Sequence, residues 1–169
     1  YAGSCEIVFS DERAALLETG GGVKKALPFL GDAPFLVANG DVLWHEADNA
    51  NQALAQMMQG FDPTAMDALL LLSARHQASG YNGKGDYMLH TDRRLTRRAE
   101  KAAAHIFAGV QILKPFLFDA MPEGAFSLNA VYDAAQARDA LFGHMLDGHW
   151  MHVGTPDGRQ AAQDYLAAP

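Results

Sequence analysis

The sequence contains a single cysteine, Cys5, among its 169 residues. One cysteine excludes an internal disulfide and is typical of proteins that work in a reducing compartment. The sequence also lacks any apolar run near the roughly 20 residues of a membrane-spanning helix, and it has no secretory signal pattern. We therefore predict a cytoplasmic protein that does not bind a membrane.

Positive charge is scarce as well. The chain has 13 lysine and arginine residues against 20 aspartate and glutamate residues, which gives a net charge of -7. Non-specific nucleic-acid binding depends on clustered basic side chains, so we expect no nucleic-acid partner.

Hydrophobic residues make up 49% and charged residues 20%, as in an ordinary globular protein. The length suits one domain with a core of its own, and we assign residues 1–169 to a single domain.

Common signatures of catalysis and metal binding are missing. No glycine-rich loop ends in Gly-Lys-Ser or Gly-Lys-Thr, and no Gly-x-Ser-x-Gly motif occurs. His144, His149 and His152 lie within nine residues, but strand alternation places His149 and His152 on opposite faces. A structural zinc site needs four ligands, commonly with cysteine among them. We therefore expect no zinc site at these histidines.

Short apolar runs alternate with segments of helical periodicity along the chain. We predict strands at 5–9, 35–38, 67–72, 106–113 and 149–153, and a hairpin formed by 87–89 and 94–98. We predict helices at 19–30, 49–60 and 128–141 and one from 155 onward, capped where possible by Thr19, Ser127 and Thr155. The glycine-rich segment 80–86 is a loop. This order favours a three-layer α/β fold with a mostly parallel sheet, in which the hairpin is an insertion or a mixed edge.

The most informative stretch joins the strand at 35–38 to Asn39, Gly40 and Asp41. A continuous apolar run is typical of a buried parallel strand, and ligands bind beyond the carboxyl ends of such strands. Asp41 offers the hard oxygen ligands that Mg²⁺ prefers. Aspartate is also common in turns, because its side chain bonds nearby backbone groups. Read alone, Asp41 fits a metal ligand or an ordinary turn residue.

A glycine turn at Thr19, Gly20, Gly21 and Gly22 leads into the first predicted helix. Free N–H groups at a helix N-terminus bind phosphates, and glycine lets a ligand approach the backbone closely. A helix start with spare glycines gives the same pattern. Both interpretations stay open on this segment alone.

A basic run stands out from the acidic background, and its members are Arg93, Arg94, Arg97, Arg98 and Lys101. Arginine binds phosphate oxygens through two parallel hydrogen bonds and lysine acts as a point charge, so this run could hold a sugar phosphate. A solvated hairpin face is the alternative. On a strand, Arg97 and Lys101 share one face, so at most half of the run can point at a ligand.

Taken together, four segments resemble the sugar-1-phosphate nucleotidyltransferase family, most of all its N-acetylmuramate-1-phosphate uridylyltransferase and mannose-1-phosphate guanylyltransferase-like members. The segments are LETGGGVKKAL (17–27), PFLVANGDV (34–42), FAGVQI (107–112) and GHWMHVGTPD (148–157). The resemblance implies a Rossmann-like nucleotidyltransferase sheet. It also implies transfer of a nucleotidyl group from UTP or GTP to a sugar-1-phosphate, with Mg²⁺ as cofactor and nucleotide and sugar phosphate as partners.

The resemblance also suggests roles for individual residues. Those that would contact the nucleotide are Glu18, Thr19, Gly20, Gly21 and Asn39. Those that would contact the sugar phosphate are Glu100, Lys101 and Gly109. Asp41 would be the catalytic residue and would hold the metal together with His152. The sugar phosphate is already anionic, so the reaction needs no protein base.

Two departures from the family pattern stand out. The family's opening Gly-x-Gly-x-Arg loop and Pro-Lys pair have no match, because the chain begins at Tyr1 downstream of their place. We therefore expect an N-terminally truncated domain that is inactive by itself. His152 stands where the family usually has a second metal-binding carboxylate, and imidazole suits Mg²⁺ poorly. These departures keep open a non-catalytic sugar-nucleotide-binding or regulatory domain, or an unrelated α/β binding domain. Base, sugar and oligomeric state stay undetermined.

Overall fold

The computed structural model describes residues 6–46 and 52–167. A large sheet has the strand order β6-β5-β7-β3-β8, with β1 also paired to β7. Its strands are β1 (Phe35–Ala38), β3 (Ala68–Ala74), β5 (Tyr87–Leu89), β6 (Leu95–Arg97), β7 (His105–Leu113) and β8 (Leu141–Met145). A small sheet has the order β2-β9-β4, and its strands are β2 (Val42–His45), β4 (Ala78–Ser79) and β9 (His149–His152).

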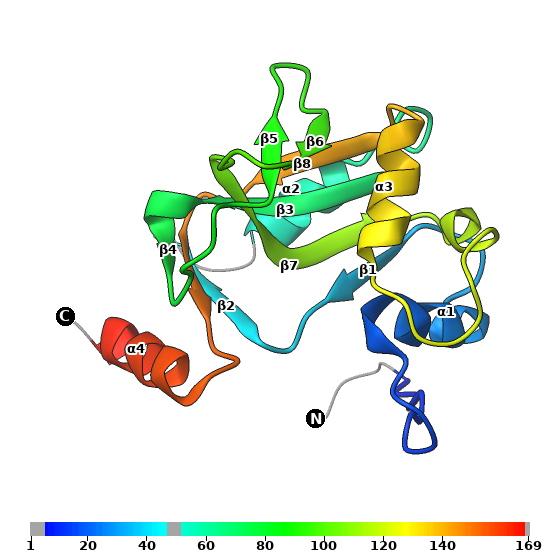
Figure 1. Cartoon of the computed structure of the whole chain (residues 1–169), viewed down its shortest axis with the longest axis horizontal. Helices are drawn as coiled ribbons and strands as arrows, with labels where there is room; N and C mark the ends of the chain where they lie inside the picture. The colour runs from blue at the N-terminus through cyan, green and yellow to red at the C-terminus, as the bar shows by residue number, and fades with distance from the viewer. Residues whose placement is uncertain (1–5, 47–51, 168–169) are drawn as a thin grey trace.

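Helices cover both faces of the large sheet (Figure 1). The helices of the described residues are α1 (Glu18–Leu30), α2 (Gln52–Gly60), α3 (Asn129–Ala137) and α4 (Pro156–Ala167), with short 3-10 turns η1 (Arg75–Gln77) and η2 (Pro115–Phe118). Helices α1 and α3 pack on one face in a single hydrophobic cluster, and α2 packs on the other face in a second cluster. Helix α4 lies against the small sheet. The predicted three-layer α/β arrangement is therefore confirmed.

Strand β3 explains how the core forms. Leu70 and Leu72 belong to the cluster beneath α1 and α3, whereas Leu69 and Leu71 belong to the cluster beneath α2. All four side chains are fully buried, so the unbroken leucine run is the signature of a strand covered on both sides. Burial of such side chains contributes about 2 kcal/mol each, which makes β3 the centre of the fold.

The expected mostly parallel sheet is wrong for the described residues. The parallel pairs are β3 with β8 and β4 with β9, and the other strand pairs are antiparallel. Parallel neighbours need a long crossover, usually a helix. Between β3 and β7 the chain forms η1, β4 and the β5–β6 hairpin and no α-helix, so β7 returns antiparallel. Helix α3 does separate β7 from β8, and β8 then runs parallel to β3.

Strand β1 is also different from the expectation. It pairs antiparallel with β7 instead of lying in a parallel sheet. Leu36 is 40% exposed, so the apolar run does not mark a strand that is buried on both faces. The position of Asn39 and Asp41 directly after the strand is nevertheless as predicted.

Several predicted boundaries shift. Residues 6–9 are exposed and form no strand, and Cys5 lies outside the described residues. The predicted helix at 128–141 ends at Ala137, because Asp139 adopts a left-handed backbone and Leu141 begins β8. The start expected at 49 also lies outside the described residues. Within the described part of the chain, no helix is long and apolar enough to cross a membrane.

Candidate functional site

Asp41 and His152 face each other where the two sheets meet. Asp41 lies in the turn between β1 and β2, and the residue after it, Val42, is the cross-strand partner of His152. The N–H of Val153 donates to the Asp41 carbonyl oxygen at 2.8 Å, which ties both backbones together. His152 Nε2 lies 3.5 Å from Asp41 Oδ2, with the Asp41 side chain 53% exposed and the His152 side chain 32% exposed.

Gly109 holds this turn close to the large sheet. The N–H of Asn39 donates to the Gly109 carbonyl oxygen at 2.8 Å. Gly109 has φ +85°, and a Cβ there would lie 2.8 Å from Val42 Cγ2. Only glycine combines this backbone with so close an approach. The structure thus brings together four predicted site residues: Asn39, Asp41, Gly109 and His152.

The pair formed by Asp41 and His152 determines which metal could bind. Among the described residues, no group of three or more histidine, cysteine, aspartate or glutamate side chains could hold an ion. Mg²⁺ does not need such a group, because one carboxylate, waters and substrate phosphates can complete its shell. Asp41 fits that role. The imidazole of His152 is a ligand that Mg²⁺ accepts poorly.

A cavity of about 290 Å³ lies on the α3 side of β7 and is lined by Asp86, Tyr87, Arg97, Arg98, Phe107 and Asn129. Phe107 is two residues before Gly109 on β7. β1 pairs with residues 110–113 of this strand and β5 meets it at His105, so a gap is left at residues 107–109. The cavity is therefore next to the stretch of β7 that Asn39 contacts.

Asp86 fills part of this gap with its side chain. Its Oδ2 accepts a hydrogen bond from the Phe107 N–H at 2.9 Å, in place of a strand partner. Its other oxygen accepts one from the Tyr81 hydroxyl at 3.3 Å. The carboxylate of Asp86 is thus held by the protein's own donors and shapes the cavity wall.

Tyr87 contributes a buried hydroxyl to the same region. The side chain is 2% exposed, and its Oη has no hydrogen-bond partner among the described residues. Burial raises the pKa of Tyr87, so the hydroxyl stays protonated and can donate a hydrogen bond. A buried polar group without a partner is costly, which marks this hydroxyl as a candidate ligand contact.

Arg97 and Arg98 differ in what they bind. Arg97 donates two hydrogen bonds to Asp133 in an ion pair, and this bonding to the carboxylate raises the pKa of Arg97. Arg98 donates from Nε to the Gly85 carbonyl oxygen at 2.7 Å and from Nη1 to the Ala99 carbonyl oxygen at 3.3 Å. Its guanidinium has no carboxylate partner among the described residues, so its charge is available to an anion in the cavity.

The glycine turn uses two of its N–H groups in contacts within the protein. The N–H groups of Gly20 and Gly21 both donate to the Phe126 carbonyl oxygen, at 2.8 and 3.2 Å, and are not free for a phosphate. A Cβ at Gly20 would lie 2.8 Å from that oxygen, and one at Gly21 would collide with the Gly124 carbonyl oxygen. The glycines therefore allow α1 to pack against the loop before α3.

The residues before and beside these glycines support the same packing. The N-cap of α1 is Leu17, and the predicted cap Thr19 instead accepts a hydrogen bond from the Leu128 N–H at 3.0 Å. Glu18 is exposed and has φ 57°. Glu12 accepts from the Leu17 N–H at 3.1 Å, and its carboxylate lies against Gly22. An acidic group therefore occupies this helix end.

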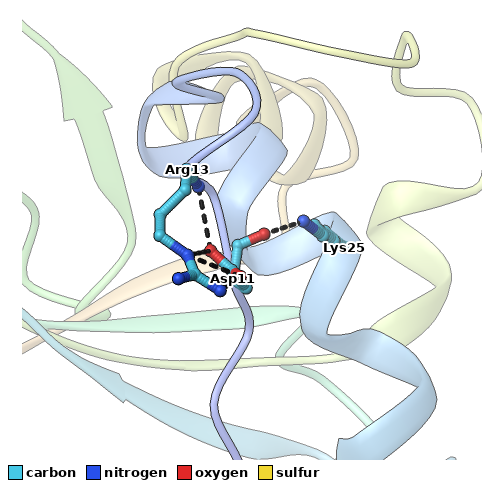
Figure 2. Close-up of polar contacts among 3 residues, drawn as sticks. All are labelled: Asp11, Arg13 and Lys25. Carbon is cyan, nitrogen blue, oxygen red and sulfur yellow. Dashed lines mark hydrogen bonds and ion pairs between the residues drawn. The ribbon is translucent and has the colours of Figure 1, made fainter.

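The loop at residues 10–13 is fixed to α1 by a small charged group. Figure 2 shows Arg13 bonded to the Asp11 side chain, while Lys25 of α1 bonds to the Asp11 carbonyl oxygen. The hydrogen bond from Arg13 lowers the pKa of Asp11. Lys25, which follows the glycine turn, thus binds the chain's own backbone in this structure.

The two remaining predicted residues lie apart from the pair. Glu100 and Lys101 are exposed in the loop between β6 and β7. Because β6 ends at Arg97, strand alternation does not extend to Lys101, and the shared face predicted for Arg97 and Lys101 is wrong. Within the basic run, Arg94 is also bound internally, to Asp92 and to the Asp139 carbonyl oxygen.

Sequence reasoning missed three residues that line the cavity: Asp86, Tyr87 and Asn129. Asp86 could have been found, because it follows a glycine-rich loop and precedes a strand as a lone carboxylate. Tyr87 and Asn129 carry no sequence signal of this kind. Their position depends on how α3 crosses the sheet.

Comparisons with known proteins identify the family of the chain. The chain is 38% identical over 162 residues to the N-acetylmuramate alpha-1-phosphate uridylyltransferase of Caulobacter vibrioides, covering 95% of the chain and 66% of that protein. It is 33% identical over 163 residues to the protein of the same name from Neisseria meningitidis serogroup B, covering 96% of the chain and 68% of that protein.

The chain thus spans about two thirds of the length of these relatives. No protein-family model matches it. A UTP-bound UGPase from Acinetobacter baumannii has the same fold, with a TM-score of 0.66 at 17% identity, over 89% of the chain and 57% of that structure. The chain belongs to the N-acetylmuramate α-1-phosphate uridylyltransferase family of sugar-1-phosphate nucleotidyltransferases.

Proposed function

We propose that the natural protein containing this chain transfers a uridylyl group from UTP to a sugar-1-phosphate and releases pyrophosphate. One observation carries the proposal. Asp41 lies in the turn after β1 that Asn39 and Val42 hold against Gly109 of β7, and a polar cavity lies at Phe107 of the same strand. The names of the two relatives, both uridylyltransferases, favour UTP over GTP.

The reaction needs positioning more than proton transfer. An oxygen of the sugar phosphate attacks the α-phosphorus of UTP, the bond from that phosphorus to the bridging β-oxygen breaks, and pyrophosphate leaves with the electron pair. Because the attacking oxygen is already anionic, no side chain has to remove a proton. A divalent cation on Asp41 would neutralise the charge on the phosphates.

The cavity is the proposed site of the acceptor sugar. Asn129 and the unpartnered Tyr87 hydroxyl offer hydrogen bonds, and Arg98 offers a charge that no carboxylate of the described chain neutralises. N-acetylmuramate differs from N-acetylglucosamine by a lactyl ether that ends in a carboxylate. An arginine fits that group well. We therefore assign an acidic acceptor, N-acetylmuramate 1-phosphate, with Glu100, Lys101 and Gly109 at the edge of its site.

The nucleotide is assigned to residues 18–21 and to Asn39. The Gly20 and Gly21 N–H groups donate to the Phe126 carbonyl oxygen. A base there would therefore pack against the flat backbone surface of the turn and would not accept hydrogen bonds from these N–H groups. The phosphates would then extend toward Asp41. UTP is a cytoplasmic metabolite, and we place the reaction in that compartment.

Phosphorus NMR tests the proposal directly. UTP, N-acetylmuramate 1-phosphate and Mg²⁺ are mixed with the natural full-length protein or with the 169-residue chain. We expect the full-length protein to form a UDP-sugar and pyrophosphate, and we expect the 169-residue chain to bind without turnover. Asp41→Ala in the full-length protein should lower kcat by about 100-fold or more. Near-normal turnover in that variant would exclude the metal role of Asp41.

A non-catalytic sugar-nucleotide-binding domain is the second candidate. It is favoured by His152, which faces Asp41 where a second carboxylate would serve Mg²⁺ better. This candidate predicts no pyrophosphate from the full-length protein in the same NMR experiment, and a rise in its melting temperature with UDP-sugar in a separate thermal-shift measurement.

A further inference from the structure

The sequence contains two Asn-Gly dipeptides, Asn39-Gly40 and Asn82-Gly83. In such a pair the backbone nitrogen of glycine can attack the side-chain amide carbon of asparagine, because glycine has no Cβ to shield that nitrogen. The attack closes a succinimide ring and requires both residues to rotate. The two dipeptides lie in different surroundings, and these determine whether the ring can close.

Asn82 and Gly83 lie in the loop that joins β4 to β5 (Figure 1). Both residues are exposed, and neither takes part in a hydrogen bond with another residue of the described chain. The loop is fixed on either side of them. The Gly85 N–H donates to the Tyr81 hydroxyl at 3.0 Å, and the Lys84 carbonyl oxygen accepts a backbone hydrogen bond at 2.8 Å. Asn82 and Gly83 are therefore free to rotate between two fixed points.

The packing of Tyr81 explains why glycine follows Asn82. A Cβ on residue 83 would lie 2.4 Å from the Tyr81 ring, so a residue with a side chain does not fit there. Tyr81 does not easily move aside, because its ring packs on Trp150 and its hydroxyl donates to Asp86 at 3.3 Å. The loop therefore requires glycine at this position, and the nitrogen of Gly83 stays open to attack.

Asn39 and Gly40 are held on both sides. The Asn39 N–H donates to the Gly109 carbonyl oxygen at 2.8 Å, and the Asp41 carbonyl oxygen accepts a second backbone hydrogen bond at the same distance. Asn39 is also only partly exposed. Rotation of this dipeptide requires the turn to open first, and a segment held in this way opens rarely. Asn39 is therefore protected in the folded protein.

We propose that Asn82 is a site of spontaneous deamidation in the folded protein and that Asn39 resists the same reaction. The nitrogen of Gly83 loses its proton and bonds to Cγ of Asn82, and the side-chain nitrogen leaves with a proton as ammonia. Water then opens the ring. Cleavage at Cγ gives aspartate, and cleavage at the backbone carbonyl carbon gives isoaspartate, which has one more carbon in the main chain. Either product adds a negative charge to the loop that ends at Asp86.

Peptide mass mapping of the natural full-length protein during incubation at neutral pH tests the proposal. Deamidation raises the mass of a peptide by about 1 Da, whereas isomerisation of Asp147-Gly148 or Asp157-Gly158 leaves the mass unchanged. Asn82→Gln is the control variant, because glutamine would have to close a larger ring that forms more slowly. A second sample, unfolded in urea, gives the rates of the two dipeptides without the folded structure.

We expect the Asn82 peptide to gain mass at least about tenfold faster than the Asn39 peptide in the folded protein, because two hydrogen bonds oppose ring closure at Asn39. In urea the two rates should agree within about twofold. In Asn82→Gln the gain in the loop peptide should disappear. Equal rates in the folded protein, or protection of Asn82 as strong as that of Asn39, would overturn the proposal. The readout is a mass and not an activity, so the result is independent of the proposed function.

Discussion

The indole N–H of Trp150 donates a hydrogen bond to the carbonyl oxygen of Ala108, 3.0 Å away in the interior. Trp150 is in β9 of the small sheet and Ala108 is in β7 of the large sheet. This bond therefore joins the two sheets between Gly109 and His152. It is one of the contacts that hold Asp41 and His152 against β7, together with the bond from Asn39 to Gly109.

Replacement of Trp150 by phenylalanine should destabilise the protein. The ring would still fill most of the space, but the buried Ala108 oxygen would lose its donor, at a cost of about 1–3 kcal/mol in the free energy of unfolding. Urea unfolding followed by circular dichroism measures this loss. Trp44→Phe is the control, because Trp44 is the cross-strand partner of Trp150 but donates to the half-buried Glu46. Equal losses in both variants would contradict the role of the inter-sheet bond.

Gly21→Ala should lower the stability of the protein, whereas Gly40→Ala should leave it nearly unchanged. A methyl group at Gly21 would overlap the Gly124 carbonyl oxygen, whereas nothing lies within 4 Å of one at Gly40. We expect a loss of about 1–3 kcal/mol for Gly21→Ala and a change within about 0.5 kcal/mol for Gly40→Ala. Thermal unfolding of the two variants tests this. A stable Gly21→Ala variant would show that the turn does not pack as described.

The Asp67 ion pairs predict a pH dependence of stability. Burial opposes ionisation of Asp67, but hydrogen bonds from Arg138 at 2.8 Å and Lys114 at 2.9 Å outweigh it and hold the pKa below 3.8. A lowered folded-state pKa adds stability above the unfolded pKa, and this is lost as pH falls through the folded value. The free energy of unfolding should therefore fall below about pH 4.

Asp67→Asn is the variant for that prediction. It should cost about 3 kcal/mol at pH 7, because it leaves Lys114 without its buried partner, and it should flatten the acid limb of the pH profile. Asp92→Asn is the control, since Asp92 pairs with Arg94 at the surface. Urea unfolding between pH 3 and pH 7 measures both the loss of stability at pH 7 and the steepness of the acid limb. An unchanged acid limb in Asp67→Asn would assign the pH dependence to other carboxylates.

Arg98→Gln should change acceptor preference in the full-length enzyme. Hydrogen bonds to a charged group contribute about 1.5–3 kcal/mol, so KM for N-acetylmuramate 1-phosphate should rise about tenfold or more. KM for N-acetylglucosamine 1-phosphate, which has no lactyl carboxylate, should stay the same. Arg97→Gln is the control, because the Arg97 charge is already paired with Asp133. An equal rise for both sugars would make Arg98 a structural residue only.

The strongest local patterns gave the correct elements. The leucines of β3, the apolar run of β7 that stops before Lys114 and Pro115, and the hairpin around Arg93 are each determined by neighbours in the sequence. Strand direction is not, because it depends on which segments cross over and which turn back. The strands β2, β4 and β8 were not predicted, because each is short and its pairing partners lie far away in the sequence. The sequence predicts Leu141 as the end of a helix, because it does not reveal the left-handed backbone of Asp139.

The candidate site was likewise predictable only in part. The relation of Asn39, Asp41, Gly109 and His152 was predictable from four motifs whose order matches a family. The glycine turn left two interpretations open, because its pattern does not reveal that the Phe126 carbonyl oxygen, more than 100 residues away, accepts hydrogen bonds from its N–H groups. The contrast between Arg97 and Arg98 also depends on distant partners, Asp133 and Gly85.

The three residues Asn39, Gly40 and Asp41 are the only covalent step from β1 of the large sheet to β2 of the small one. The chain crosses between the two sheets again from β3 to β4, from β4 to β5 and from β8 to β9. Several connections and the buried Trp150 bond therefore hold the small sheet against the large one. Asp41 thus lies in a turn whose two ends belong to different sheets that the rest of the chain keeps in one arrangement.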